Sequence, residues 1–378
     1  MKLNQIHTGT SHWTGIFVAM LAFCLIPLRL AAQFTDAKKP QGFAGAPYIK
    51  YSPETGWVGG LVGLYYFYIG GDTSVHDTRP SDFSAGVMYS QKHQYSIGIN
   101  TDEYFVHDAY HFNAGVHYQR IPLDFFGVGN YSPSSPLDNY TPIRRGGEFY
   151  FTKNLIRSPR GEGFNAGIQA EFRNDEILSS NPGGIVASGT IPGASGGMSD
   201  GIGALALFDT RDNKYSTHDG HYEDIEAIFY GRSFGSDYTF NRYTLDLRRF
   251  IPLTESQTLA VQAYGVLANG NEPFYLMAGL GGDSKLRGYY LLRFRDNDMG
   301  LLQAEYRFPV WWRFGAAIFA GAGEVGHTLS DFRLDGLHPS FGLGVRLLVV
   351  PREHISARVD YGIGSDSRQI YFSILEAF

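Results

Sequence analysis

GLGGDSKLRGY, residues 279–289, is the stretch that decides how this chain folds. Glycines at 279, 281, 282 and 288 free the backbone from Cβ atoms, as a loop confined in a narrow space requires. About ten short segments with alternating hydrophobicity precede the stretch and about five follow it. A long cationic side chain such as Arg287 can fix a loop to a barrel wall through charge-assisted hydrogen bonds. The stretch therefore predicts a barrel with one long loop folded back into its lumen.

Alternation of side chains with period two predicts the strands of this barrel. In 355–363 (ISARVDYGI) the odd positions are apolar, whereas Ser356, Arg358, Asp360 and Gly362 fall on the opposite face. A long apolar face opposite a charged, glycine-containing one fits lipid outside and water inside. The same rule predicts an all-β, transmembrane antiparallel barrel of sixteen strands, at 46–52, 56–70, 82–90, 94–105, 109–120, 142–157, 163–174, 199–211, 221–233, 238–250, 257–269, 298–310, 312–325, 338–350, 354–364 and 369–378.

The longest connections all run from an odd-numbered to an even-numbered strand, counted in chain order. With the N-terminus on the periplasmic side, the long connections 121–141, 175–198, 270–297 and 326–337 all lie outside the cell. Long outer loops with short inner turns are the pattern of bacterial outer-membrane barrels. The stretch 279–289 then belongs to the sixth extracellular loop.

The seam between the first and last strands is predicted to be weak. The first strand, 46–52, is short and is bracketed by Pro47 and Pro53, and proline donates no ladder hydrogen bond. The last strand ends on an aromatic residue, Phe378, which alternation places on the apolar face with Ile370, Phe372 and Ile374, Glu376 being the exception in that row. A terminal aromatic in this register is similar to the signal that assembly machinery reads on outer-membrane barrels. These residues are the candidates for a lateral seam.

Composition supports a membrane barrel and excludes several other classes of protein. Aromatic residues make up 15% of the chain and charged residues 18%, and no apolar run of 18 residues follows residue 32. This favours a barrel with aromatic girdles over a transmembrane helix, the alternative being a soluble β-sandwich or lipocalin-like barrel. The sole cysteine, Cys24, and the net charge of −6 argue against thiolate metal sites and nucleic-acid binding. No cofactor or metal is predicted.

The N-terminal region reads as an export signal. Lys2 precedes an apolar core at 16–28, and small residues at 31 and 32 follow it. We therefore expect a signal peptide at 1–32, a short segment at 33–45 and the barrel domain at 46–378 in the bacterial outer membrane.

The tip Leu286-Arg287-Gly288-Tyr289 resembles the signature in the sixth loop of the 85-kilodalton outer-membrane-protein superfamily, also called the bacterial surface antigen family, which includes the BamA, TamA and FhaC barrels. The sequence EYRFP, residues 305–309, resembles the family strand that follows this loop. Alternation places Glu305 on the lumen face, where it can anchor Arg287. In the next strand Gly321 stands where the family carries an aspartate, so Glu324 is the candidate second anchor. The alternative for Arg287 is a solvated loop arginine.

The resemblance implies a barrel that assists insertion or export of outer-membrane or surface proteins. Family members that handle unfolded clients usually carry periplasmic POTRA domains, but this sequence resembles a short branch without them. It therefore implies a separate periplasmic or lipoprotein partner, an unfolded outer-membrane protein as client, and lipid and lipopolysaccharide around the barrel. The alternative is a passive channel or structural barrel. No enzyme is predicted: 197–201 fits Gly-x-Ser-x-Gly but lies where a loop enters a strand, without the helix which that motif needs.

Overall fold

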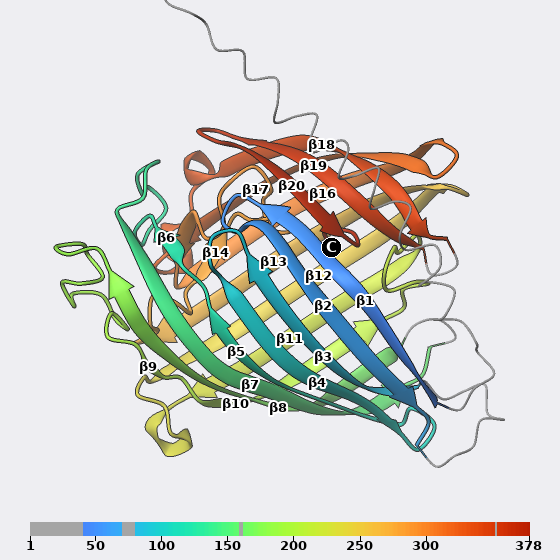
Figure 1. Cartoon of the computed structure of the whole chain (residues 1–378), viewed down its shortest axis with the longest axis horizontal. Helices are drawn as coiled ribbons and strands as arrows, with labels where there is room; N and C mark the ends of the chain where they lie inside the picture. The colour runs from blue at the N-terminus through green and yellow to red at the C-terminus, as the bar shows by residue number, and fades with distance from the viewer. Residues whose placement is uncertain (1–40, 70–79, 159–161, 352–353) are drawn as a thin grey trace, which may run out of the picture.

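Antiparallel strands close into a barrel in the computed structural model, which describes residues 41–69, 80–158, 162–351 and 354–378 (Figure 1). The sixteen-strand antiparallel barrel expected from the sequence is confirmed. The predicted signal peptide, 1–32, lies outside the described residues, as do residues 33–40 of the segment that follows it. Among the described residues, no helix is long and apolar enough to cross a membrane.

The wall strands follow one another in chain order, and each pairs with its neighbour in the sequence. They are β1 (Gln41–Ser52), β2 (Gly56–Phe67), β3 (Ser81–Ser90), β4 (Tyr95–Phe105), β5 (Tyr110–Arg120), β7 (Asp138–Ile156), β8 (Gly163–Ser180), β10 (Gly201–Asp209), β11 (Gly220–Tyr230), β12 (Phe240–Thr254), β13 (Gln257–Gly270), β16 (Asp298–Trp311), β17 (Phe314–Gly326), β18 (His338–Val350), β19 (Ile355–Gly364) and β20 (Arg368–Ile374). Four short strands belong to the extracellular region: β6 (Leu123–Phe125), β9 (Gly197–Met198), β14 (Ala278–Leu280) and β15 (Phe294–Asp296).

The first and last strands differ from their predicted bounds. β1 begins at Gln41 rather than at residue 46, and it pairs with β2 along its whole length, from Gln41 opposite Phe67 to Ser52 opposite Gly56. Pro47 is accommodated within this ladder, so a proline did not shorten the strand. β20 ends at Ile374, because Leu375 has a φ of 73°, which no strand can continue.

Side chains alternate between lipid and lumen along the strands. On β12, Leu245 is exposed on the outer surface, whereas its neighbour Asp246 is buried on the lumen side and accepts a hydrogen bond from Gln262 of β13. Trp311 and Trp312 are exposed at the turn between β16 and β17, where aromatic side chains suit a membrane interface. The apolar outer face and polar inner face are those that the sequence pattern predicted.

The packed core consists mainly of loops folded inside one end of the barrel. In Figure 1 the extracellular elements β6, β9 and β14 gather at the left end of the barrel. One cluster of buried side chains joins Phe125, Tyr140 and Phe274 from three different parts of the chain. A second cluster packs the long loop onto the lumen wall; its buried members are Val266, Leu280, Leu286, Tyr289, Phe294, Met299, Leu301 and Val325. The long loop thus lies within the barrel, held first by apolar burial.

Candidate functional site: loop tip, lumenal ion pairs and strand seam

The tip of the long loop lies flat on the lumen face of β19. Gly288 has a φ of 120°, and a Cβ on it would lie 2.8 Å from the main-chain carbonyl carbon of Ile363. A Cβ on Gly362 would in turn lie 2.6 Å from the Gly288 nitrogen. Because both positions are glycine, the two backbones can touch. Leu286 also adopts a left-handed φ, 58°, although it is not glycine, and its side chain is buried in the second cluster.

The hydroxyl groups of Tyr371 and Tyr289 hold the loop tip in place through hydrogen bonds. The Tyr371 hydroxyl of β20 accepts a hydrogen bond from the Gly288 N–H at 3.1 Å and donates one to the Tyr289 carbonyl at 2.8 Å. The Tyr289 hydroxyl donates to the Pro339 carbonyl at 2.8 Å and accepts from the Ser365 N–H. These bonds connect the loop tip to the start of β18 and to the last strand. The loop is therefore joined directly to one side of the seam.

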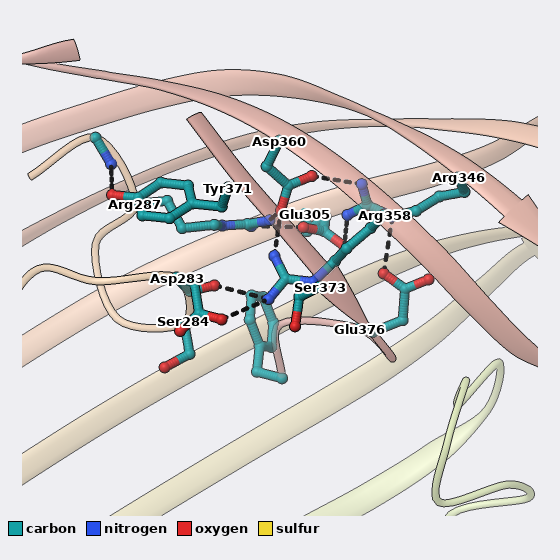
Figure 2. A network of polar contacts seen from close by, with 12 residues as sticks. Asp283, Ser284, Arg287, Glu305, Arg346, Arg358, Asp360, Tyr371, Ser373 and Glu376 are labelled. Atoms are coloured by element: carbon teal, nitrogen blue, oxygen red, sulfur yellow. Dashed lines mark hydrogen bonds and ion pairs between the residues drawn. The ribbon is translucent and has the colours of Figure 1, made fainter. Parts of the chain in front are cut away.

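Arg287 is buried at the centre of the site, with only 1% of its surface exposed. Its guanidinium donates to Asp360 Oδ2 at 2.6 Å and to Glu305 Oε2 at 2.5 Å (Figure 2). It also lies 3.6 Å from the centre of the Phe319 ring, a cation–π contact. The structure thus pairs Arg287 with Glu305, the anchor predicted from alternation, and the alternative of a solvated loop arginine is wrong.

The second predicted anchor, Glu324, does not contact Arg287, so that expectation is wrong. On β17, Phe319 points to the lumen beside Arg287, and Glu324 falls on the opposite face by alternation. Glu324 accepts a hydrogen bond from the Arg333 N–H at 3.0 Å and holds an extracellular loop instead. Asp360 of β19 supplies the second carboxylate, two strands away from the position of Gly321.

The two acids that bind Arg287 belong to a larger buried network. Glu305 also accepts from Arg307 at 2.7 Å and Arg346 at 3.2 Å, and Asp360 accepts from Arg346 at 2.5 Å and pairs with Arg358. Every carboxylate in this group faces at least two guanidinium groups (Figure 2). Without Arg287 each of the two acids would still face two guanidinium groups, so the loss would be that of two charged hydrogen bonds, about 1.5–3 kcal/mol each.

The residues after β20 turn into the lumen and join this network. Glu376 pairs with Arg346 at 2.9 Å. The Phe378 carbonyl accepts from Arg307 at 2.9 Å, and its ring packs against Phe250 and Ala260. The placement of Phe378 on the lipid face of the seam is therefore wrong. The reversal at Leu375 also explains why Glu376 breaks the apolar row that the sequence suggested for this strand.

A second ionic contact connects the loop to β1 on the other side of the seam. Lys50 of β1 lies 2.7 Å from Asp283 Oδ2, and Arg358 of β19 donates to the Asp283 carbonyl at 2.9 Å. Burial acts to raise the pKa of Asp283, but Lys50 and Arg358 outweigh it and hold that pKa below its ordinary value. We call Lys50, Asp283 and Arg358 the seam latch, because Asp283 bridges strands on opposite sides of the seam.

The seam itself is held by little main-chain pairing. Over the described residues, Tyr51 opposite Phe372 is the single register pair between β1 and β20. On the outer surface the Trp57 ring of β2 contacts both of those side chains, its centroid lying 5.2 Å from that of Tyr51 and 6.1 Å from that of Phe372. The ladder pair, this aromatic contact and the seam latch all lie at the extracellular end of β1. Pro47, a predicted seam residue, lies in the part of β1 without a partner strand on this side.

Pro53, the other proline predicted at the seam, lies in the turn between β1 and β2. Its carbonyl accepts a hydrogen bond from Lys92 at 2.6 Å. The weakness of the seam therefore has a different origin from the predicted one. It results from the early end of β20 and the inward turn of the residues that follow, and not from a short first strand.

The fold and the site define a class of protein: a transmembrane β-barrel whose long sixth loop is anchored inside the lumen by an arginine. The chain belongs to the Omp85 superfamily, because the model of the Omp85 superfamily domain matches residues 79–378. The family expected from the loop tip is thus confirmed, and membership indicates an outer-membrane protein. None of the curated proteins compared with this chain matches it.

Solved structures with the same fold include BamA and CdiB barrels. The crystal structure of BamA from Haemophilus ducreyi lacking POTRA domains 1–3 has a TM-score of 0.60 and 13% identity, covering 89% of this chain and 70% of that one. CdiB from Acinetobacter baumannii (TM-score 0.59, 11% identity) and CdiB from Escherichia coli (0.59, 12%) also cover 89% of this chain. This chain spans 60% and 62% of the two CdiB chains, respectively. At these identities the likeness establishes the fold alone.

Proposed function

We propose that this barrel assists the insertion or export of other proteins at the bacterial outer membrane by opening its seam. Membership of the Omp85 superfamily supports a general role in protein insertion or translocation. The single observation that carries the proposal for this chain is the seam, where β1 and β20 share one register pair. By comparison, β1 pairs with β2 over its entire length. A wall joined this weakly at one place opens there first.

The free side of β1 supplies a template for a client strand. Residues 41–50 have no partner strand on the seam side among the described residues. A strand edge offers N–H and C=O groups to an incoming strand, as in β-augmentation. We propose an unfolded outer-membrane protein as the client. The proposed partner that delivers this client is a separate periplasmic protein or lipoprotein, in line with the general reliance of the family on partner proteins.

The proposed action involves no chemical reaction and no cofactor. Among the described residues, no group of three or more His, Cys, Asp or Glu side chains is placed to bind a metal ion. Ser199 is buried where β9 leads into β10, in a strand context instead of the strand–turn–helix of a nucleophile elbow. Outer-membrane lipid and lipopolysaccharide are the proposed surroundings of the outer face. A passive channel is the alternative function.

A disulfide across the seam tests the proposal against this alternative. Tyr51→Cys with Phe372→Cys places two thiols on directly opposed residues, within the separation that a disulfide spans. Oxidation should abolish insertion of a reporter barrel into liposomes, and reduction should restore it. The control is Val345→Cys with Val359→Cys, an opposed pair in the continuous ladder between β18 and β19. Insertion that survives oxidation of the seam pair, or steady channel conductance without any insertion, would reject seam opening.

A further inference from the structure

Part of the lumen wall beside the seam is apolar over three neighbouring strands, with Ser84 and Asp82 of β3 following on the same face towards the periplasmic end. Because Lys50 pairs with Asp283 inside the lumen, the even-numbered residues of β1 face the lumen. The register then places on that face a set of residues without charge: Tyr48 of β1, Gly60, Val62 and Leu64 of β2, and Gly86 and Met88 of β3. Val62 is 45% exposed and Met88 43% exposed, so the long loop leaves them uncovered.

The same strands are also apolar on their outer face. Leu61 and Val87, which directly oppose each other, face the lipid and are exposed there. Other parts of the lumen wall are polar, as at Asp246 and Arg248 of β12. A barrel wall normally alternates apolar-out with polar-in. Apolar surface left exposed in an aqueous lumen is therefore a marker of an interaction site.

This surface is continuous with the unpaired side of β1. Ala46 opposes Val62, and Tyr48 opposes Gly60, so the same strand forms both the rim of the apolar wall and the edge of the seam. A polypeptide can satisfy both features, because its main chain pairs with the edge and its side chains cover the wall. A lipid acyl chain offers no hydrogen-bonding groups to a strand edge. The combination therefore favours a polypeptide occupant.

We propose that Val62, Leu64 and Met88 form a lumenal docking surface for the apolar side chains of a client polypeptide that pairs with β1. This inference rests on the proposed function and adds the chemistry of the client segment to it. The preferred segment carries apolar residues on both faces where it enters the seam. Such a segment moves from the lumen to the bilayer past β1–β3 without leaving apolar contact, because both faces of that wall are apolar.

Two peptides derived from the chain's own last strand test the docking surface. The parent peptide has the sequence of 368–378 (RQIYFSILEAF), in which the face opposite Ile370, Phe372 and Ile374 carries the polar residues Gln369 and Ser373. The second carries Gln369→Leu and Ser373→Leu and is apolar on both faces. Fluorescence anisotropy would measure their binding to the full chain in phospholipid nanodiscs. The doubly apolar peptide should bind the unmodified barrel more tightly than the parent peptide does.

The variant Val62→Thr with Met88→Gln removes apolar surface from the lumen while keeping side-chain size. It should weaken binding of the doubly apolar peptide by about five- to tenfold and leave the parent peptide unchanged. Val87→Thr is the matched control, the same exchange on the outer face of the neighbouring strand, and it should change neither affinity. Equal binding of both peptides to the unmodified barrel and to the double variant would overturn the proposal.

A photoreactive residue at position 62 provides a second measurement that does not depend on folding of the double variant. Benzoylphenylalanine in place of Val62 should capture the doubly apolar peptide; capture of nanodisc phospholipid instead would show a site for acyl chains and overturn the proposal. The liposome insertion assay distinguishes failure of the proposed function from failure of the docking surface. Failure of the unmodified barrel to insert a client rejects the proposed function, whereas normal insertion without preference between the peptides rejects only the docking surface.

Discussion

Replacement of Lys50 by methionine should loosen the seam on its lumen side. Methionine keeps the length and apolar stem of the side chain but removes the ammonium group that lies 2.7 Å from Asp283. Asp283 retains Arg358, which approaches its side chain at 3.5 Å and donates to its carbonyl. No carboxylate is therefore stranded, and the loss is that of one charged hydrogen bond. Such a bond contributes about 1.5–3 kcal/mol, and less where it is partly open to water.

A loss of this size predicts a measurable change in the opening of the seam. Since about 1.4 kcal/mol corresponds to a factor of ten, the ratio of open to closed seam should rise by about 10- to 100-fold. Hydrogen exchange of the full chain in nanodiscs reports that ratio as the loss of protection at the amides around Tyr51 and Phe372. Amides in the continuous ladder between β18 and β19 should keep their protection, because the latch does not act on them.

Lys92→Met is the matched control for this experiment. Lys92 lies near the same extracellular turn, and its ammonium group donates to the Pro53 carbonyl at 2.6 Å instead of pairing with an acid of the latch. It should leave exchange at the seam unchanged. Lys50→Arg, which keeps the charge, should retain most of the protection. Unchanged seam protection in Lys50→Met, with the loop still docked, would refute the idea that the latch holds the seam closed.

Further predictions concern the loop tip and its anchors. Arg287→Ala removes one charged hydrogen bond from each of Glu305 and Asp360, so the barrel should lose about 3–6 kcal/mol at about 1.5–3 kcal/mol a bond. The loss should be visible as altered heat-modifiable gel mobility and faster proteolysis of the loop; unchanged mobility and proteolysis would contradict an anchored tip. Gly288→Ala should undock the tip nearly as strongly, since its φ is 120° and a Cβ would strike β19; proteolysis of the loop at the unmodified rate would show that the backbones can separate. Glu324→Gln should leave the tip docked, because that side chain accepts a hydrogen bond from the Arg333 N–H in another loop. Loss of docking in this variant would show that Glu324 is an anchor of the tip. Burial lowers the pKa of Lys285 from 10.5 to about 8. Because the folded protein holds this proton less tightly than the unfolded chain, docking of the loop should strengthen as pH rises from about 8 towards 10.5. In Lys285→Met, protection of the loop from protease should no longer increase with pH over this range. An increase as large as that of the unmodified protein would show that other groups cause the pH dependence.

Local patterns in the sequence were sufficient for the architecture and for one ion pair. Period-two alternation reports which face of a strand is wet, so the strands, the lumen placement of Glu305 and the inward loop followed from residues close together in the chain. The pairing of Arg287 with Glu305 joins positions 287 and 305. The acid lies on the strand that directly follows the loop, so a short segment of sequence contained both partners.

The predicted site was wrong at two residues: Glu324, which lies on the opposite strand face from the lumen, and Phe378, which follows the end of the last strand. Glu324 has the right charge, but it stands on the outer face of β17, whereas the lumen position two residues after Phe319 is a glycine. Phe378 was predicted to face lipid because alternation was continued through Leu375, where the backbone leaves the strand. Alternation is reliable only as long as the strand continues, and the reversal at Leu375 has no signal in the local sequence.

By itself the sequence determined the barrel, its inward loop and which face of each strand is polar, because these depend on residues close together in the chain. Apart from the pair of Arg287 with Glu305, only the tertiary structure decided which charges meet. Lys50 reaches Asp283, and Asp283 reaches Arg358, because closure of the sheet brings β1 beside β19 and β20 while the loop fills the space between them. The stagger of the closing strands and the packing of the loop fix those distances. No pattern along one strand contains that information, and so the latch, the single register pair at the seam and the apolar wall beside it became visible only in three dimensions.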